Sequence, residues 1–466
     1  MTKLATALLA FCACAIAESP QAVAIRNAKI VTVSGPAIAK GTVVLRGGLI
    51  DAVGDNVPIP ADAWIVDGEG LSVYPGLIDA LSTVGIPGAA PATTATSGRG
   101  GRGQTTPAPV TTPTPAAPTA ATTTPARGPE DRPNTTSWIL AADEIQPADR
   151  RIETVRSAGF TTTVTYPTRG ILAGQGSIID LISGEKSGDM VVVPSVAQYI
   201  SFTRTGGGGG GGFGAFPSAL MGYIAYVRQV YLDADHYRLV KDAYAHDPRG
   251  MERPAYDRAL EGVLASRRIL LPANRLVEMD RMLRFAAELK QPVILYGMRE
   301  GYRPEAGILL KKSGAPVLVS LHWAEAPRDP DPEAVESLRN LLNVDRGPST
   351  AAALQKAGVP FAFYTDGIDQ PRDLQRAVRK AIDAGLSREE AIRALTLSPA
   401  EIYGVADRLG SIDKGKIGNL VVTKGDLFEP GARVEMIFVD GRQYKPAPET
   451  PTGGRGQATE EPGVNQ

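Results

Sequence analysis

Cysteine and histidine are scarce in this chain of 466 residues. It contains two cysteines, Cys12 and Cys14, and three histidines, His236, His246 and His322. Both cysteines precede Ala17, so a chain cleaved after Ala17 would have no disulfide, no thiolate nucleophile and no cysteine-bound metal. Three histidines also leave little material for a histidine-rich metal centre.

An excess of charge of either sign is lacking as well. Lys and Arg number 49, Asp and Glu number 50, and the formal net charge is −1. Nucleic acid or an anionic membrane surface would call for a basic face, so neither is expected as the main partner. A small-molecule ligand or another protein fits this balance better.

Apolar runs long enough to cross a membrane are missing, and the longest one lies at the beginning of the chain. Residues Leu4–Ile16 are nearly all apolar, and small residues at Ala15 and Ala17 suit cleavage by a signal peptidase. Thirteen residues are too few to span a hydrocarbon core of about 30 Å. Residues 1–17 are therefore predicted to be a signal peptide of a periplasmic or secreted protein, with acylation of Cys14 as the alternative processing.

Three segments have too few bulky apolar residues to form a core. Gly88–Thr136 is rich in Thr, Pro, Gly and Ala, and we expect a disordered insertion at 88–136. A Gly-rich loop is expected at 205–214 and a disordered tail at 446–466. The glycine run Gly206–Gly212 is not followed by Lys-Ser/Thr, so it does not indicate a phosphate-binding loop.

The remaining chain separates into terminal β-rich parts and a mixed middle. Short apolar, β-branched runs broken by Gly, Asp and Pro occur from Ala22 to Val73 and again near Asn419–Tyr444. We expect one composite β-sandwich built from residues 18–74 and 411–445. Between them, over residues 75–410, strands and helices alternate, as is typical of parallel strands with helical crossovers.

Particular strands and helices can be predicted in the middle part. The strands are expected at Thr161–Pro167, Ile269–Ala273, Pro292–Gly297, Pro316–Leu321 and Phe361–Gly367. Helices are expected at Leu276–Leu289, Pro304–Ser313 and Pro348–Gly358. Ser387 and Ser398, each followed three residues later by Glu, predict two helix starts with capping boxes.

Two segments carry a resemblance to a known family. LSVYPGLIDA (Leu71–Ala80) resembles the entry to the first barrel strand of the amidohydrolase superfamily, and Gly385–Val422 resembles that superfamily's C-terminal stretch. Within the superfamily, the chain is similar to bacterial imidazolonepropionase-like amidohydrolases, and Gly170–Leu181 adds to this. The resemblance implies an α/β fold with a (β/α)₈ TIM-like barrel and a composite β-sandwich domain formed by both termini.

The resemblance also implies a chemistry. Such enzymes hydrolyse C–N bonds of amides, imides or cyclic ureas with one or two divalent metals at the carboxyl ends of the barrel strands. The metal acidifies a bound water and polarises the substrate carbonyl. An Asp on the last strand binds metal and accepts the proton of the water, and Asp366 in FAFYTDG matches it.

The other ligands of that family are missing from this sequence. The first strand of the family carries His-x-His after Pro-Gly-Leu-Ile-Asp plus one residue, but here Asp79 is followed by Ala80, Leu81 and Ser82, and neither histidine is present. The histidines of the fifth and sixth strands would fall within Leu271–Asn274 and near Tyr296, and neither place has a histidine. A counterpart of the bridging carboxylated lysine is not evident.

Five positions remain as candidates for the site. Asp366 is the predicted catalytic residue, and Ser82, Asn274, Tyr296 and His322 are predicted to line a ligand pocket. His322 follows the apolar run Val317–Leu321, so it could face that pocket or be bonded at the barrel rim. No metal or other cofactor is expected, although a weakly bound divalent ion at Asp366 stays open as an alternative.

Two hypotheses follow for the function. The first is an exported, metal-free, degenerate homologue that acts as a binding or partner subunit, either as a homo-oligomer or paired with an active amidohydrolase. The second is an active amidohydrolase on a small amide or cyclic amide, with an atypical site around Asp366. The missing ligands favour the first, because water without a metal to acidify it is a poor nucleophile at neutral pH.

Overall fold

The computed structural model describes residues 22–86, 132, 134–184, 186–202, 219–326, 335–368 and 370–447. The predicted signal peptide at 1–17 and the Gly-rich loop at 205–214 lie outside these residues, as do most of the predicted insertion and tail. No helix of the described part combines the length and the apolar character that a membrane crossing needs.

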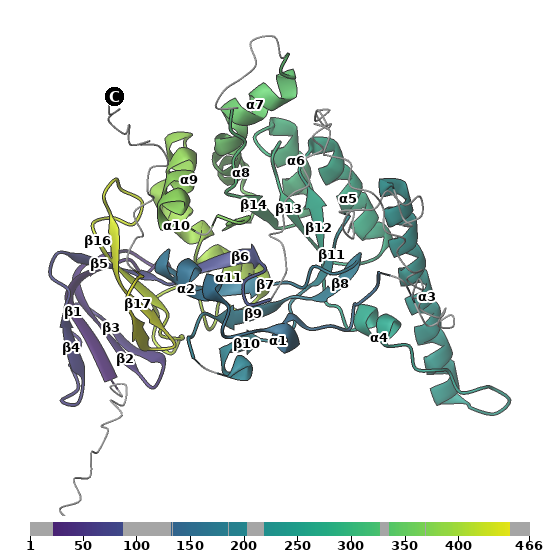
Figure 1. Ribbon diagram of the computed structural model, residues 1–466, viewed down its shortest axis with the longest axis horizontal. Coiled ribbons are helices and arrows are strands. Elements are labelled where there is room, and N and C mark those ends of the chain that lie inside the picture. The colour runs from purple at the N-terminus through teal and green to yellow at the C-terminus, as the bar shows by residue number, and fades with distance from the viewer. Residues whose placement is uncertain are drawn as a thin grey trace, which may run out of the picture.

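Strands from both ends of the described chain form one eight-stranded sheet, shown in purple and yellow in Figure 1. Its strands are β1 (Ala22–Ile30), β2 (Ile38–Arg46), β3 (Leu49–Gly54), β4 (Trp64–Asp67), β5 (Leu71–Pro75), β16 (Leu420–Lys424), β17 (Arg433–Val439) and β18 (Arg442–Tyr444). β5 pairs with β16 along its whole length, so Val73 lies opposite Val422. The expectation of a composite β domain from both termini is confirmed.

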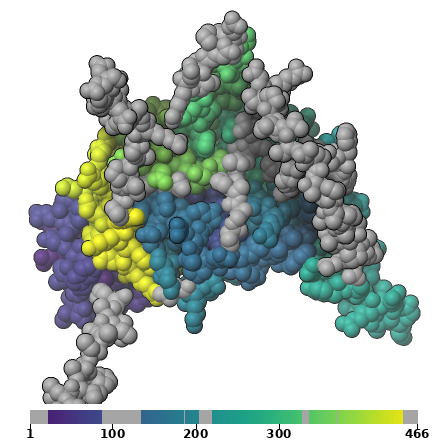
Figure 2. All heavy atoms as spheres, in the orientation of Figure 1, coloured from purple at the N-terminus to yellow at the C-terminus, as the bar shows by residue number. Residues whose placement is uncertain are grey.

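The core of this terminal sheet consists almost entirely of aliphatic side chains. Ile25, Val43 and Leu45 from the N-terminal strands pack with Leu420 and Phe438 from the C-terminal strands. The alternation of β-branched and polar residues in these segments explains why they form strands with one buried face. Figure 2 shows the C-terminal strands packed beside the N-terminal ones at one end of the molecule.

The middle part contains two further sheets. A four-stranded sheet has the order β10-β9-β7-β6, and a six-stranded sheet has the order β15-β14-β13-β12-β11-β8. The strands are β6 (Leu77–Ser82), β7 (Phe160–Thr165), β8 (Leu172–Gln175), β9 (Ser177–Asp180), β10 (Val191–Val193), β11 (Gln198–Ile200), β12 (Ile269–Ala273), β13 (Val293–Gly297), β14 (Val317–Ser320) and β15 (Phe361–Tyr364).

Parallel pairing runs without interruption from β11 to β15, and β6 also pairs parallel with β7. β15 lies next to β6, although no ladder of backbone hydrogen bonds joins these two in the described chain. Hydrogen bonds to a side chain join them instead. The carboxylate of Asp79 on β6 accepts from the backbone N–H and the hydroxyl of Thr365, just after β15. The predicted fold class holds, and the bonds between Asp79 and Thr365 join the edge strands of the two sheets, β6 and β15.

Helices cover the outer face of the parallel strands (Figure 1). They are α1 (Ala141–Glu144), α2 (Arg150–Ser157), α3 (Leu220–His246), α4 (Arg258–Leu264), α5 (Leu276–Glu288), α6 (Pro304–Ser313), α7 (Leu338–Arg346), α8 (Thr350–Ala357), α9 (Pro371–Asp383), α10 (Arg388–Ala394) and α11 (Leu397–Tyr403), with short 3-10 turns at Ser187–Met190 and Gly347–Ser349. The predicted helix Pro304–Ser313 is confirmed to the residue, with Pro at its first position and Gly314 ending it in a left-handed conformation.

One of the two predicted helix starts is wrong. Ser387 caps α10 by accepting a hydrogen bond from the backbone N–H of Glu390, as expected. Ser398 caps nothing, because α11 begins one residue earlier at Leu397. The connection between α10 and α11 is fixed by packing: the backbone N–H of Ile78 donates to the carbonyl of Leu395, and Gly410 lies tightly against Thr396 and Leu397.

The predicted insertion also extends too far. Residues 87–131 and 133 lie outside the described part, but Asn134, Thr135 and Thr136 are placed and belong to the fold. The backbone N–H of Thr136 donates to the carbonyl of Leu172, and the hydroxyl of Thr135 is bonded to Tyr226. An isolated β-bridge pairs Thr135 with Leu172. Such backbone pairing orders this polar stretch and cannot be predicted from its composition.

Candidate functional site

The candidate site lies at the carboxyl ends of β6 and β12–β15, where the predicted site residues occur. Asp366 comes two residues after β15, is 5% exposed, and has a φ of 52°. Met298, just after β13, also has a positive φ of 61°. A left-handed backbone at two non-glycine residues is sterically unfavourable and tends to persist where the surroundings hold it, often at functional positions.

Asp366 is held from its neighbouring strand. The hydroxyl of Ser320, at the end of β14, donates to Oδ2 of Asp366 over 2.8 Å, and the same oxygen of Ser320 accepts from the backbone N–H of His322 over 3.0 Å. Ser320 thus links the predicted catalytic carboxylate to the backbone of His322. Sequence reasoning missed Ser320, although its place at the end of the apolar run before His322 is a usable signal.

A second carboxylate lies close to Asp366. Oδ1 and Oδ2 of Asp79 accept from the backbone N–H and the hydroxyl of Thr365 over 3.0 and 2.6 Å. Burial raises the pKa of Asp79 to about 7, the bonds from Thr365 oppose this, and the charge of Asp366 adds to it. Asp79 therefore fixes the residue preceding Asp366 and so positions the Asp366 backbone.

Five buried tyrosines belong to one hydrophobic cluster with aliphatic residues of the barrel strands and of α11. Tyr166, Tyr199, Tyr296, Tyr364 and Tyr403 are all at most 5% exposed. The rings of Tyr166 and Tyr199, Tyr199 and Tyr296, and Tyr296 and Tyr364 lie in contact, with centroids 5.6, 5.8 and 6.4 Å apart. We refer to these five residues as the tyrosine cluster.

The phenol groups of this cluster bond mostly to one another. The hydroxyls of Tyr199 and Tyr296 are 3.1 Å apart, and Tyr166 donates to Tyr403, which donates to the carbonyl of Ala80 over 2.7 Å. Burial raises the pKa of Tyr199 to about 12. It also raises the pKa values of the other four phenols, Tyr166, Tyr296, Tyr364 and Tyr403. The cluster is therefore neutral and serves as packing with internal hydrogen bonds.

The other predicted pocket residues have different surroundings. Ser82 ends β6 and is buried, and its hydroxyl accepts from the backbone N–H of Val84, so it stabilises a turn. Asn274 follows β12. Its backbone bonds to Glu278 and Glu300, and its buried side-chain Oδ1 has no hydrogen-bond partner within the described ranges. Tyr296 belongs to the tyrosine cluster.

His322 lies at the rim, with an exposed side chain. It borders a cleft of about 240 Å³ together with Trp323, Asp373 and Lys380, and a much smaller cavity of about 10 Å³ beside Arg299 and Ser320. The 10 Å³ cavity has room for about one water molecule. The other two histidines, on α3, lie far along the chain from this site, and Asp242 near His246 pairs with Arg238.

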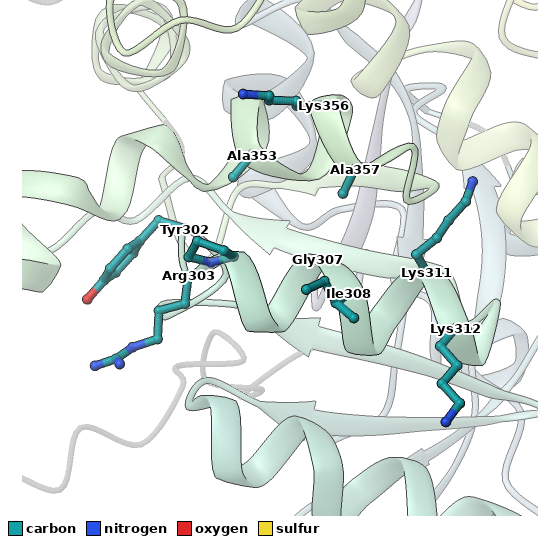
Figure 3. A pocket seen from close by; sticks show the side chains of 10 residues that line it. Tyr302, Arg303, Gly307, Ile308, Lys311, Lys312, Ala353, Lys356 and Ala357 are labelled. Atoms are coloured by element: carbon teal, nitrogen blue, oxygen red, sulfur yellow. The ribbon is translucent and has the colours of Figure 1, made fainter.

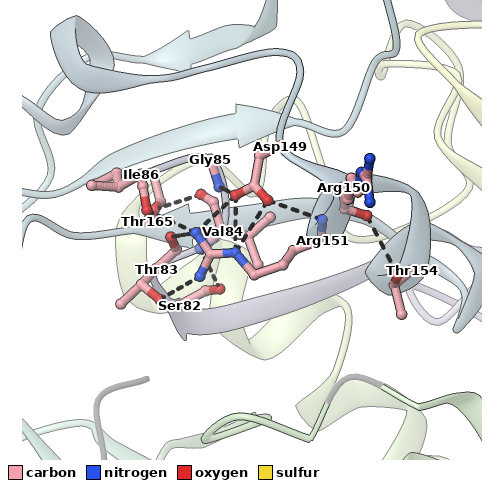
Figure 4. A network of polar contacts seen from close by, with 10 residues as sticks. All are labelled: Ser82, Thr83, Val84, Gly85, Ile86, Asp149, Arg150, Arg151, Thr154 and Thr165. Carbon is pink, nitrogen blue, oxygen red and sulfur yellow. Dashed lines mark hydrogen bonds and ion pairs between the residues drawn. The ribbon is translucent and has the colours of Figure 1, made fainter. Parts of the chain in front are cut away.

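The turn after β6 is fixed by a polar network shown in Figure 4. The guanidinium of Arg151 donates to Oγ1 and the carbonyl of Thr83 and to the carbonyl of Ile86, and it also pairs with Asp149. Asp149 accepts from the backbone N–H of Gly85 over 2.9 Å. This network immobilises the chain where a metal-binding first strand would present its ligands.

A metal centre of the kind that the family uses does not suit these residues. The turn after Asp79 offers hydroxyl and apolar side chains, both oxygens of Asp79 accept from Thr365, and Tyr296 has a phenol in place of an imidazole. Within the described part of the chain, no three His, Cys, Asp or Glu side chains come together in a way that could hold a metal ion. The donor set fits packing better than coordination.

Comparisons with known proteins agree with this architecture. The model of the amidohydrolase family matches residues 339–446. A crystal structure of an amidohydrolase from Thermotoga maritima superposes with a TM-score of 0.68 at 23% identity, covering 91% of this chain and 100% of that one. The predicted resemblance to the amidohydrolase superfamily is confirmed, and the chain has its fold.

Curated relatives match over shorter stretches of their own length. An imidazolonepropionase of Flavobacterium johnsoniae is 36% identical over 97 residues, which are 20% of this chain and 23% of that protein. An adenine deaminase of Moorella thermoacetica is 39% identical over 69 residues, 15% of this chain and 11% of that protein. The amidohydrolase tasK of Hapsidospora irregularis is 21% identical over 433 residues, covering 86% of this chain and 39% of that protein. This chain therefore spans well under half of these relatives.

Proposed function

We propose that this protein is an exported, metal-free relative of the amidohydrolases whose barrel serves as a binding or partner subunit. The observation that carries the proposal is the tyrosine cluster. Its five side chains are buried among the barrel strands and α11, and the phenols of Tyr166, Tyr199, Tyr296 and Tyr403 bond to one another or to the backbone. A hydrolase of this family needs that region for metal ligands and for an activated water.

The partner in this proposal is a small-molecule ligand, a second copy of the chain or an active amidohydrolase homologue. In the last case, the homologue would catalyse the hydrolysis, and this chain would contribute a second barrel to the complex. Function resides in the site and not in the barrel as such, so likeness of fold does not argue for hydrolysis here.

One observation favours the alternative, an active amidohydrolase with an atypical site. Asp366 is buried, has a strained backbone, and receives the hydroxyl of Ser320 at the strand end where catalytic groups of barrels lie. The imidazolonepropionase likeness would make a small cyclic amide its substrate. Without a metal, a general base contributes only about 10²–10⁴-fold, which is a small part of the acceleration that amide hydrolysis requires.

The two functions can be separated by assaying hydrolysis of small linear and cyclic amides with added Zn²⁺ or Mn²⁺. The proposal predicts the same background rate for the wild-type protein, Asp366→Ala and the matched rim variant His322→Ala. Turnover of the wild-type protein that is lost in Asp366→Ala would establish the atypical enzyme, and the rate of His322→Ala would then show whether the rim takes part. Co-expression with a homologue that has an intact His-x-His motif, followed by size-exclusion chromatography, tests the partner arm.

A further inference from the structure

A groove of about 580 Å³ opens on the outer surface between α6 and α8. Figure 3 shows Tyr302 and Arg303 at one end, Lys311 and Lys312 towards the other, and Lys356 on the α8 side. It lies on the helical outer face of the barrel, away from the tyrosine cluster and Asp366. Whatever it binds is therefore independent of the chemistry inside the barrel.

The floor of the groove is apolar and built from small residues. Gly307 of α6 faces Ala357 of α8 so closely that a Cβ on Gly307 would come within 3.0 Å of the Ala357 Cβ. Ala353 continues this shallow floor, and Ile308 beside it is 71% exposed. A large aliphatic side chain that is exposed beside a groove indicates a binding surface, because burying it against a partner is energetically favourable.

The rim of the groove is cationic. Arg303, Lys311, Lys312 and Lys356 border it, and no Asp or Glu is among the residues that line it. The ammonium of Lys311 is held by the carbonyl of Gly358 over 2.8 Å, so one cation is fixed in place. The charge is local, because the chain as a whole carries a net charge of −1.

The end of the groove near Arg303 keeps a positive charge in spite of a nearby carboxylate. Glu300, which is buried, pairs with Arg303 over 3.5 Å and with Arg339 over 3.3 Å. Two guanidinium groups around one carboxylate leave about one positive charge there. Cations thus stand at both ends of an apolar floor.

We propose that the groove between α6 and α8 binds an extended acidic peptide segment of a partner protein, with an apolar side chain on the floor and carboxylates against the rim cations. The length of α6, ten residues, corresponds to about 15 Å, which matches four or five extended residues. The volume is within the usual range for a binding site. Charge complementarity selects an acidic segment over a basic or neutral one.

The test uses the full chain and fluorescently labelled peptides of six residues in which leucine alternates with aspartate, with lysine or with serine. Fluorescence anisotropy should show saturable binding of the leucine–aspartate peptide and none of the leucine–lysine peptide. Binding should weaken as salt is raised from 50 to about 500 mM, because rim charges are exposed and screened. The leucine–serine peptide should bind more weakly by about tenfold or more.

Variants identify the groove as the place of binding. Lys312→Glu combined with Lys356→Glu should weaken binding of the leucine–aspartate peptide by at least about tenfold, which is 1.4 kcal/mol. Lys40→Glu combined with Lys424→Glu makes the same change of charge on exposed positions of the terminal sheet, and it should leave binding unchanged. Ile308→Ser tests the apolar floor and should weaken binding by several-fold.

Three results would overturn the proposal. They are equal binding of the acidic and basic peptides, equal weakening by the two charge-reversal pairs, and the absence of binding by the wild-type chain. Size-exclusion chromatography with light scattering tests the other possible occupant of the groove, a second copy of this chain. A wild-type dimer that binds no peptide and becomes monomeric in Ile308→Ser would assign the groove to self-association instead.

Discussion

The core of the terminal sheet and the interior of the barrel are equally buried, yet they differ in the polar side chains that they contain. The terminal sheet packs Ile25, Leu45, Val422 and similar aliphatic residues, and Phe438 is the aromatic among them. The barrel interior contains aliphatic residues as well, but among them lies the tyrosine cluster, in which two pairs of phenols bond to each other.

This difference shows which part of the molecule has an additional constraint. Aliphatic side chains are sufficient for a core whose task is stability, because burying them needs no polar partner. A buried phenol needs a hydrogen-bond partner and specifies its neighbours. The barrel interior therefore contains a defined polar arrangement, and the following predictions test it against the terminal core.

The largest effect is expected from removing a tyrosine ring. Tyr364→Ala should lower the free energy of unfolding by about 3–5 kcal/mol, because Tyr364 is fully buried and its ring contacts Tyr296. Ile25→Val in the terminal core, as the comparison, should cost about 0.5–1.5 kcal/mol. Urea unfolding monitored by circular dichroism measures both. A loss below 1 kcal/mol for Tyr364→Ala would mean that the barrel interior is loosely packed.

The second effect is a pH dependence of stability from Asp79. Its pKa is about 7 in the folded chain and 3.8 as its ordinary value, so between these pH values the folded state binds more protons than the unfolded state. The contribution of Asp79 to stability should therefore fall as pH rises from about 4 to about 7 and level off above that, by on the order of 3 kcal/mol.

Asp79→Asn, which cannot ionise, should flatten this slope. The measurement is urea unfolding of the wild-type chain and of Asp79→Asn at pH values from 4 to 8. Asp180, whose pKa burial also raises to about 7, remains in both proteins and supplies a slope of the same sign. Identical slopes for the two proteins would show that Asp79 is charged in the folded state at pH 5.

A smaller effect is expected from removing one phenol oxygen. Tyr403→Phe takes away the hydroxyl that donates to the carbonyl of Ala80 and accepts from Tyr166. Leaving that buried carbonyl and that phenol without this partner should cost about 1–2 kcal/mol. If Tyr403→Phe proves neutral in thermal unfolding, the hydroxyl network contributes nothing beyond the packing of the rings.

The smallest effect is expected at His322. Its side chain is exposed at the rim, so His322→Ala should change the free energy of unfolding by less than about 0.5 kcal/mol. Thermal unfolding with and without Zn²⁺ checks this, and addition of Zn²⁺ should not separate the two proteins. Zinc stabilisation of the wild-type chain that disappears in His322→Ala would place a metal at the rim.

Much of the architecture could be predicted because local patterns and packing agree. Pro304–Ser313 has Pro at its start and Gly after its end, and the runs at Ile269–Ala273 and Phe361–Tyr364 are apolar and short enough to indicate buried strands. The start of α11 could not be predicted from Ser398, because packing between α10, β6 and Gly410 decides where that helix begins.

The candidate site was only partly predictable. Asp366 could be recognised from its place after the last strand. The hydrogen bonds of Ser320 to Asp366 and of Thr365 to Asp79 depend on how neighbouring strands are paired, which the sequence does not show. The tyrosine cluster could have been predicted from the positions of the tyrosines. Tyrosines stand within or just after four separate barrel strands, at Tyr166, Tyr199, Tyr296 and Tyr364.

The most direct test of the central claim is the metal content of the protein, purified without chelators and then incubated with excess Zn²⁺ or Mn²⁺ and desalted. We predict far less than one metal ion per chain by elemental analysis, and the same value for Asp366→Ala. One or two ions per chain in the wild type, lost in Asp366→Ala, would contradict the account and show that the barrel interior rearranges to hold a metal centre.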